Sequence, residues 1–431
     1  MSQNADLGKA LLGTNLALLQ LMWALVSGAF LPSRGAVHSA LQQAGFAGAE
    51  VRRGWQALCY GVWSSQELLA RWRQWVKSET SWQPHQYEGW QPLAIDITTF
   101  WRPRLQGWAG RFFHQLAQQL LPGVAFAVVV QVGQIANQRA PLLSKLIRAE
   151  GCHREAGLKR RLLAWVRAHL GPAEVAVCDA GIRLQQMQAA GVPRFVLRLA
   201  KNCTVRRNEL PARQGRGRPL EYGLLLRPLA RNYKDHALPA SQPDVWGAFG
   251  VADEQGGGEV TVRFHGWLAV VGAQQKVAED IETVTVWLFW DPRFRDPLVL
   301  ATNVAATAAS IYHLYRDRWP VEQPPLAAKQ MLGLHRHFVF APTSVWRLPE
   351  LALLLGNVLT IMAMLLPPIP SGYWDRQPRK TTGRLRRALG QTAFPNSYPL
   401  DGRTRKKASC TAHLPKGIAA HRRLPRAVPA R

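Results

Sequence analysis

The sequence predicts a mixed α/β protein with a helical N-terminal region, a central α/β core and a β-rich insertion. Between residues 91 and 202, short apolar runs rich in β-branched residues alternate with helical patterns. Residues 203–300 are rich in Gly, Pro and alternating β-formers, and residues 301–370 return to helix. The chain has 431 residues, 47% of them hydrophobic, which is enough for two or three domains with a sizeable core.

Residues 1–90 read as helical. Ser33 is a helix start signal, and Gly45 and Phe46 mark a turn before a second helix over residues 49–63. Two short helices joined by a glycine turn are typical of a helix-turn-helix, although an ordinary helical hairpin produces the same pattern. In either case this region could contact DNA phosphates through five basic side chains. These are Arg52, Arg53, Arg71, Arg73 and Lys77.

Residues 91–202 form the first part of the predicted core. Strands are expected at residues 93–100, which carry Asp96, at 124–135, at 174–182, which carry Asp179, and at 194–202. Helices are expected at residues 142–170 and 183–190. Each aspartate follows or interrupts an apolar strand, where it either caps a turn or supplies a carboxylate to a site.

The segment after Asp179 is too long for a simple connection. Glu322 lies 143 residues further along the chain, and a helix that follows a strand in one compact fold seldom needs such a loop. We therefore predict that residues 203–300 are a β-rich insertion and that residues 301–370 complete the core with helices. Residues 371–431 are polar, basic and rich in Pro and Gly, which predicts a mostly disordered tail.

The net charge is strongly basic. The chain has 54 Lys and Arg against 27 Asp and Glu, a formal charge of +27. The predicted tail holds 15 of the cations and two of the acids, so the rest of the chain is basic as well. A charge of this size predicts a polyanionic partner, with nucleic acid first and an anionic membrane surface second.

Two apolar stretches are long enough to cross a bilayer. Residues 10–33 and 351–370 contain no charged side chain, yet both include Gly, Asn and Thr. We interpret them as buried core helices. Five cysteines without a Cys-x-x-Cys pair or zinc-like spacing indicate reduced thiols, and no secretory signal is apparent. These observations favour a cytoplasmic protein without a membrane partner.

The segment over residues 315–329 carries the most specific pattern. Tyr315, Arg318, Glu322 and Lys329 follow one another at spacings of three, four and seven residues. On one helix these spacings place a phenol, a carboxylate and two cations on a common stripe. Carboxylates bind hard divalent cations, and neighbouring cations bind phosphate oxygens. Three prolines, at positions 320, 324 and 325, predict that the helix bends or restarts near residue 324.

This pattern resembles the YREK signature of bacterial insertion-sequence transposases of family four, which are DDE transposases with an RNase H-like catalytic core. Trp319, directly after Arg318, is also similar to the family. The resemblance implies that Asp96, Asp179 and Glu322 form the catalytic triad and bind two Mg²⁺ ions, with Mn²⁺ as a substitute.

The resemblance also implies a set of DNA contacts. Tyr315, Arg318 and Lys329 would contact phosphates of the transposon end, and Trp319 would stack against a displaced base. The expected partner is double-stranded DNA, both the inverted repeats at the transposon ends and the target. Two protomers would form a homodimer on this DNA, in the bacterial cytoplasm at the nucleoid. The implied reaction is Mg²⁺-dependent hydrolysis at the transposon ends followed by strand transfer.

Three alternatives remain open. A catalytically inactive, decayed transposase would bind DNA without cutting it. A basic membrane-associated protein would use the two apolar stretches as anchors. An RNase H-like nuclease would cut DNA without joining it to a target.

Overall fold

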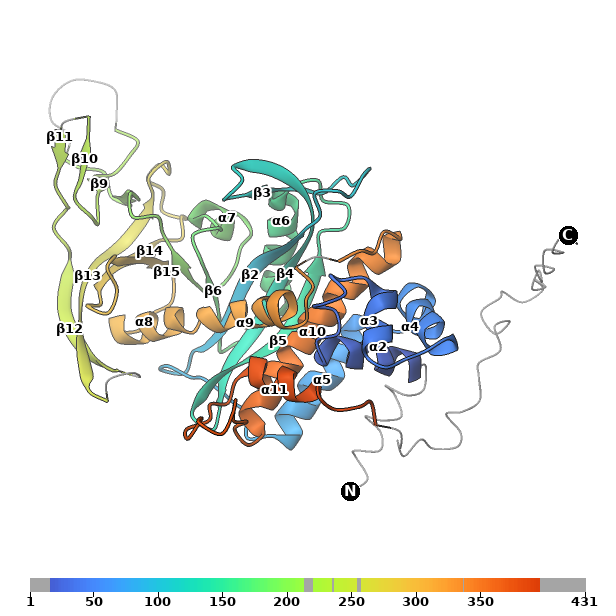
Figure 1. Ribbon diagram of the computed structural model, residues 1–431. Helices are drawn as coiled ribbons and strands as arrows, with labels where there is room; N and C mark the ends of the chain where they lie inside the picture. Colours follow the sequence, from blue (N-terminus) through green and yellow to red (C-terminus); the bar gives the residue numbers. More distant parts are fainter. Residues whose placement is uncertain (1–15, 213–219, 235, 254–256, 336, 396–431) are drawn as a thin grey trace, which may run out of the picture.

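The computed structural model describes residues 16–212, 220–234, 236–253, 257–335 and 337–395. It confirms a mixed α/β class. One large mixed sheet of 13 strands crosses the molecule, with helices packed along it (Figure 1). The strands of the insertion lie at one end of the molecule and the N-terminal helices at the other (Figure 1).

The N-terminal region is helical as predicted, within the described residues. Its helices are α2 (Leu16–Val26), α3 (Val37–Gln43), α4 (Ala49–Tyr60) and α5 (Ser65–Glu79). The turn between α3 and α4 contains Gly45 at φ +87°, a conformation that favours glycine. The predicted pair of short helices joined by a glycine turn is therefore present. The short strand β1 (Gln83–Pro84) follows and pairs with β4.

Five strands make up the central part of the sheet. They are β2 (Gln91–Trp101), β4 (Gln119–Ile135), β5 (Gln138–Arg148), β6 (Glu174–Cys178) and β7 (Phe195–Arg198). Their spatial order is β5-β4-β2-β6-β7, in which the first three strands are antiparallel and the last two run parallel to β2. Strand β3 (Arg111–His114) forms a hairpin with the start of β4. Helix α6 (Glu155–His169) connects β5 to β6, and α7 (Leu184–Ala189) connects β6 to β7.

The helix predicted over residues 142–170 is wrong in its first part. Leu142, Leu143 and Leu146 lie on strand β5, and the helix begins only at Glu155. All three leucines are buried, because β5 is covered by helices as well as paired with β4. A strand buried on both faces does not show a period-2 pattern, so its leucines look the same as those of a helix.

The segment over residues 203–300 is rich in strands, as predicted. It contains β8 (Val205–Arg207), β9 (Leu225–Leu226), β10 (Arg231–Tyr233), β11 (His236–Leu238), β12 (Val245–Ala252), β13 (Glu259–Gly272) and β14 (Val284–Trp290), and β15 (Leu298–Thr302) ends it. These strands do not form an independent sheet, apart from the pair β10 and β11. Strand β15 is hydrogen-bonded to β7, so the central sheet continues into the insertion.

The second apolar stretch belongs to helix α10 (Pro342–Leu365), which is mostly buried. Among the described residues it is the only helix whose length and composition would allow it to span a membrane. Its Asn357 side chain accepts hydrogen bonds from the Leu143 amide and the Trp72 indole, and donates one to the Pro141 carbonyl. These bonds fix α10 against β5 and α5, as expected of a core helix.

The prediction of a mostly disordered tail is wrong for its first part. Helix α11 (Thr382–Leu389) begins with the Thr381 hydroxyl accepting a hydrogen bond from the Arg384 amide, and it packs its buried Leu385 against the core. Lys380 donates a hydrogen bond to the Met364 carbonyl at the end of α10. One apolar side chain per turn is enough for so short a helix when it packs on an existing surface. The rest of the predicted tail, residues 396–431, lies outside the described residues.

Candidate active site

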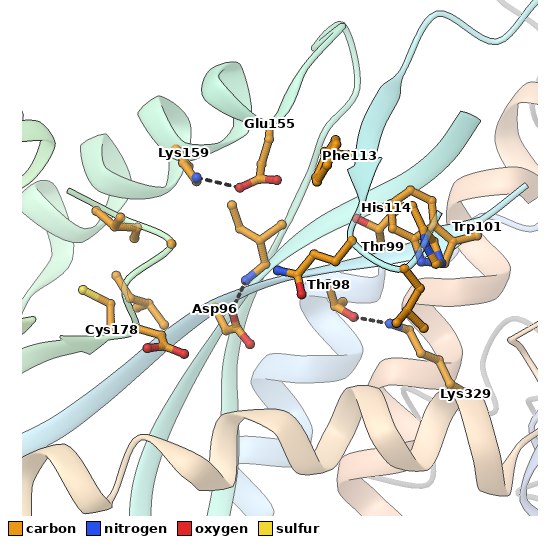
Figure 2. Close-up of a pocket in the computed structure, with 17 residues that line it drawn as sticks. Asp96, Thr98, Thr99, Trp101, Phe113, His114, Glu155, Lys159, Cys178 and Lys329 are labelled. Atoms are coloured by element: carbon orange, nitrogen blue, oxygen red, sulfur yellow. Dashed lines mark hydrogen bonds and ion pairs between the residues drawn. The ribbon is translucent and has the colours of Figure 1, made fainter. Parts of the chain in front are cut away.

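Two of the predicted acids lie on neighbouring parallel strands. Strands β2 and β6 pair in a register that places Ala94 opposite Val177. Asp96, in the middle of β2, and Asp179, directly after the end of β6, each come two residues after this pair, so the two carboxylates are side by side on the same face of the sheet. Both line a cavity of about 400 Å³ between helix α6 and the β3–β4 hairpin (Figure 2). We call it the α6 cavity.

The Asp96 carboxylate lies in a poorly hydrated environment. Its Oδ1 accepts a hydrogen bond of 2.7 Å from the Ile97 amide, and no described cation forms an ion pair with it. Burial raises the pKa of Asp96 to about 6. The Ile97 amide and the Arg318 guanidinium oppose this rise in pKa, while the charges of Glu322 and Asp179 add to it. The three acids therefore lie close enough to influence one another electrostatically.

Asp179 has partners from two other elements. Its Oδ1 accepts a long hydrogen bond of 3.3 Å from the Tyr315 hydroxyl and lies 3.4 Å from the Arg198 guanidinium. Burial raises the pKa of Tyr315 to about 12, with a further contribution from the Asp179 charge, so the phenol stays protonated at neutral pH. Tyr315 of the YREK segment thus contacts Asp179 directly.

The YREK segment is not one continuous helix. Helix α8 (Ala308–Arg316) ends before Arg318, a 3₁₀ turn η1 (Trp319–Glu322) follows, and α9 (Gln323–Leu326) leads into a π-helical turn η2 (Ala327–Met331). The single stripe is therefore wrong, and the restart next to residue 324 is confirmed. Pro320 begins the 3₁₀ turn and the proline pair begins α9, because proline has no amide hydrogen to donate inside a helix.

Arg318 connects the tyrosine to the glutamate. Its guanidinium lies 2.8 Å from the Glu322 Oε1 and 5.9 Å from the centre of the Tyr315 ring. Burial alone would lower the pKa of Arg318. Interactions with Tyr315, Glu322 and Asp179 outweigh the effect of burial, so the pKa of Arg318 is raised. Trp319, the next residue, is 54% exposed.

Lys329 approaches Asp96 from the other side. Its Nζ donates a hydrogen bond of 2.8 Å to the Thr98 hydroxyl (Figure 2). The same Nζ lies 5.3 Å from the centre of the Phe100 ring. Burial lowers the pKa of Lys329 to about 8, against an opposing influence from Asp96. Of the four YREK residues, Lys329 alone lines the α6 cavity.

Two of the other YREK residues and the neighbouring Trp319 face a second, larger cavity, whereas Glu322 lines neither cavity. Tyr315, Arg318 and Trp319 line this space of about 1220 Å³. Its wall also includes Arg139, Arg198, Arg295 and Arg316. We call it the α8 cavity. The two cavities share no lining residue and meet at the contact between Tyr315 and Asp179.

The buried carboxylate of Asp317 binds the YREK segment to other parts of the fold. Asp317 lies between Arg316 and Arg318 and is completely buried. Its Oδ2 accepts hydrogen bonds from the Tyr87 hydroxyl at 2.8 Å and from His85 Nδ1 at 2.6 Å, and its Oδ1 lies 2.9 Å from Arg139 Nε. Asp317 therefore connects the YREK segment to residues before β2 and at the start of β5.

The donor chemistry suits a hard divalent cation. Asp96 and Asp179 are carboxylates on adjacent strands, and Asp96 is partly buried without a cation paired to it, which is costly unless an ion binds. Within the described residues, no three His, Cys, Asp or Glu side chains are close enough to hold one metal ion, and Glu322 is bound to Arg318. Two carboxylates and waters suffice for Mg²⁺, and Glu322 would join after leaving Arg318.

Six of the seven predicted site residues line one of the two cavities, and Glu322 is paired with Arg318. Sequence reasoning missed the supporting residues Thr98, Arg198 and Asp317, because their contacts are made with other elements of the fold and leave no local signal. Thr98, for example, is 231 residues from Lys329.

Comparison with protein-family models finds no match for this chain, and comparison with curated proteins finds none. The transposase resemblance therefore rests on the sequence motif alone and stays a prediction.

Proposed function

We propose that this protein is a DDE-type DNA transposase that hydrolyses a phosphodiester at transposon ends and transfers the freed strand. One observation carries the proposal. Asp96 on β2 and Asp179 just after the parallel strand β6 are side by side on one face of the sheet, and the chain brings Tyr315, Arg318 and Lys329 to them from more than 130 residues away.

The strand order supports an RNase H-like core. Three antiparallel strands, β5-β4-β2, followed by the parallel strands β6 and β7, with helices in the last two connections, form the order expected of that fold. Glu322, the third proposed acid, lies on the helical segment after the insertion, and its charge acts on Asp96.

In this proposal Asp96, Asp179 and Glu322 hold two Mg²⁺ ions. When bound, Mg²⁺ activates an attacking water or 3′-hydroxyl and stabilises the leaving oxygen. Arg318 and Lys329 bind phosphate oxygens on opposite sides of Asp96, because one faces the α8 cavity and the other the α6 cavity. The Tyr315 hydroxyl holds the Asp179 carboxylate in place.

The α8 cavity suits the transposon end. It offers several arginines and the exposed Trp319 ring, on which a base could stack. The net charge of +27 supports a DNA partner, since phosphates would release their counterions to these side chains. A homodimer on DNA at the nucleoid remains part of the proposal.

The pH dependence of DNA binding tests the role of Lys329. Because its pKa is about 8, the ammonium loses its charge between pH 7 and pH 9, whereas an arginine at this position stays charged. We expect DNA affinity to fall roughly threefold to tenfold over this range in the wild type and less in Lys329→Arg. Fluorescence anisotropy of a labelled duplex at constant ionic strength measures it. Equal pH slopes for both proteins would contradict the role.

A second candidate function is favoured by the ion pair between Arg318 and Glu322. This pair occupies the third acid, as in a protein that binds DNA but no longer cuts it. Such a protein would bind DNA with a steep salt dependence and leave it intact in both Mg²⁺ and Mn²⁺.

The deciding experiment uses the full-length protein and a supercoiled plasmid that carries its gene with the natural flanking DNA. In Mg²⁺ we expect nicks that map to short inverted repeats on both sides of the gene, and no nicks in EDTA. Binding without nicking would select the inactive DNA binder. Nicks scattered over the plasmid, without joining of ends to a target, would select an RNase H-like nuclease.

A further inference from the structure

The β3–β4 hairpin carries apolar side chains that the fold does not bury. Leu116, in the turn over residues 115–118, is 94% exposed, and Phe113 on β3 is 49% exposed. A single exposed apolar residue is ordinary, so what matters here is that two of them lie on one hairpin beside the proposed site.

The hairpin is held in a defined position. The Ala117 amide donates a hydrogen bond of 3.1 Å to His114 Nδ1, which closes the turn. The His114 ring lies 4.7 Å from the ring of Trp101, at the end of β2. Strand β2 also carries Asp96, so the hairpin tip is fixed relative to that acid.

The tip belongs to the wall of the α6 cavity. Phe113, His114 and Leu116 line it together with Asp96 and Asp179, and Figure 2 shows Phe113 and His114 on the side opposite Cys178. Of the remaining lining residues, Glu155 is the one other acid, and its Oε1 is 2.6 Å from Lys159 Nζ.

The charge around the hairpin fits a polyanion. From Ile97 to Ala149 the chain has no Asp or Glu. Arg104, before β3, and Arg111, its first residue, are both exposed. An apolar tip on a segment with exposed arginines and no acid resembles the wedges that some proteins insert into the minor groove of DNA.

Strand transfer requires two DNA molecules at one set of carboxylates. If the α8 cavity holds the transposon end, the target must approach from elsewhere. The α6 cavity opens on the other side of the same acids and shares no lining residue with the α8 cavity.

We propose that the β3–β4 hairpin binds the target DNA, with Leu116 and Phe113 inserted between base pairs of its minor groove. This inference rests on the proposed transposase function. A wedge here would bend the target and present one of its phosphodiesters at Asp96 and Asp179, opposite the strand end held in the α8 cavity.

The test separates the two steps of the reaction. The variants are Leu116→Gln and Phe113→Ser, and the matched control is Leu224→Gln, an equally apolar residue that is 60% exposed outside both cavities. End nicking is measured on the plasmid, and strand transfer is measured with precut ends and a separate target duplex. We expect the ratio of strand transfer to nicking to fall about tenfold or more in both variants and to stay at the wild-type value in the control.

Each other outcome overturns the inference. Normal strand transfer by Leu116→Gln and Phe113→Ser would show that the hairpin does not hold the target. An equal loss of nicking and transfer would place the hairpin at the transposon end or in folding. A change in the sedimentation of the protein–DNA complex would make the tip a contact between copies. A wild-type protein that nicks no DNA would remove the proposed function itself.

Discussion

Asp96→Asn should abolish nicking and, at the same time, make the metal-free protein more stable. The folded protein holds Asp96 at a pKa of about 6, well above its ordinary value of 3.8. The folded state therefore binds a proton that the unfolded state releases, and stability falls as pH rises from about 4 to about 6. Above pH 6 the full cost is present, at most about 3 kcal/mol.

Asparagine removes this cost because it carries no charge. At pH 8 in EDTA, calorimetry should give Asp96→Asn a melting temperature about 2 to 5 °C above that of the wild type, and the two should converge near pH 4. Adding Mg²⁺ should raise the wild-type melting temperature and leave the variant almost unchanged. The expected loss of nicking is about a thousandfold or more, because the proposed ions would lose a ligand.

The exposed Asp280 supplies the matched control. Asp280→Asn should change neither melting temperature nor nicking. If Asp96→Asn destabilised the protein at pH 8 and still cut DNA, Asp96 would be a structural carboxylate and the assignment of the triad would be wrong.

Asp317→Ala should have the largest effect on stability. The change removes a fully buried carboxylate and leaves Arg139, His85 and Tyr87 without their common partner. Removing one partner of a buried ion pair lowers the free energy of unfolding by about 3–5 kcal/mol, a change that urea denaturation can measure. Since Asp317 immediately precedes Arg318, we also expect nicking at saturating DNA to fall, with a smaller change in DNA affinity.

Asp317→Asn and Asp280→Ala complete this experiment. Asparagine can still accept the Tyr87 hydrogen bond, so Asp317→Asn should lie between the wild type and the alanine variant. Asp280→Ala removes an exposed carboxylate and should cost almost nothing. An Asp317→Ala protein as stable as the wild type would show that the cluster contributes little to the fold.

The sequence predicted the strands that carry the acids because their signal is local. The runs around Asp96 and Asp179 are short, apolar and bounded by polar or glycine residues, and each became a strand. The same reasoning failed at Leu142 and Leu146, where burial on both faces hides the period of a strand. It also failed at Leu385, because packing on α10 stabilises a helix that its own sequence would not.

For the site, the residue types and spacings predicted the break in the YREK segment, which the structure confirms, and the assignment of acids and cations, which stays a prediction. They did not locate partners that meet across the fold. Asp317 looks like any charged residue at a helix end, yet it is buried by segments near residues 85 and 139. In the sequence Leu116 is an ordinary loop residue, and only the structure shows that it lines the same cavity as Asp96.

The hydrogen bonds between β7 and β15 have a mechanical consequence. Arg198, Leu197 and Val196 pair with Leu300, Ala301 and Thr302, so the insertion and the strand next to Asp179 form one stiff plate. A hinge motion between them would have to break these hydrogen bonds. If the protein binds DNA as proposed, we therefore expect the duplex, rather than this part of the protein, to deform on binding.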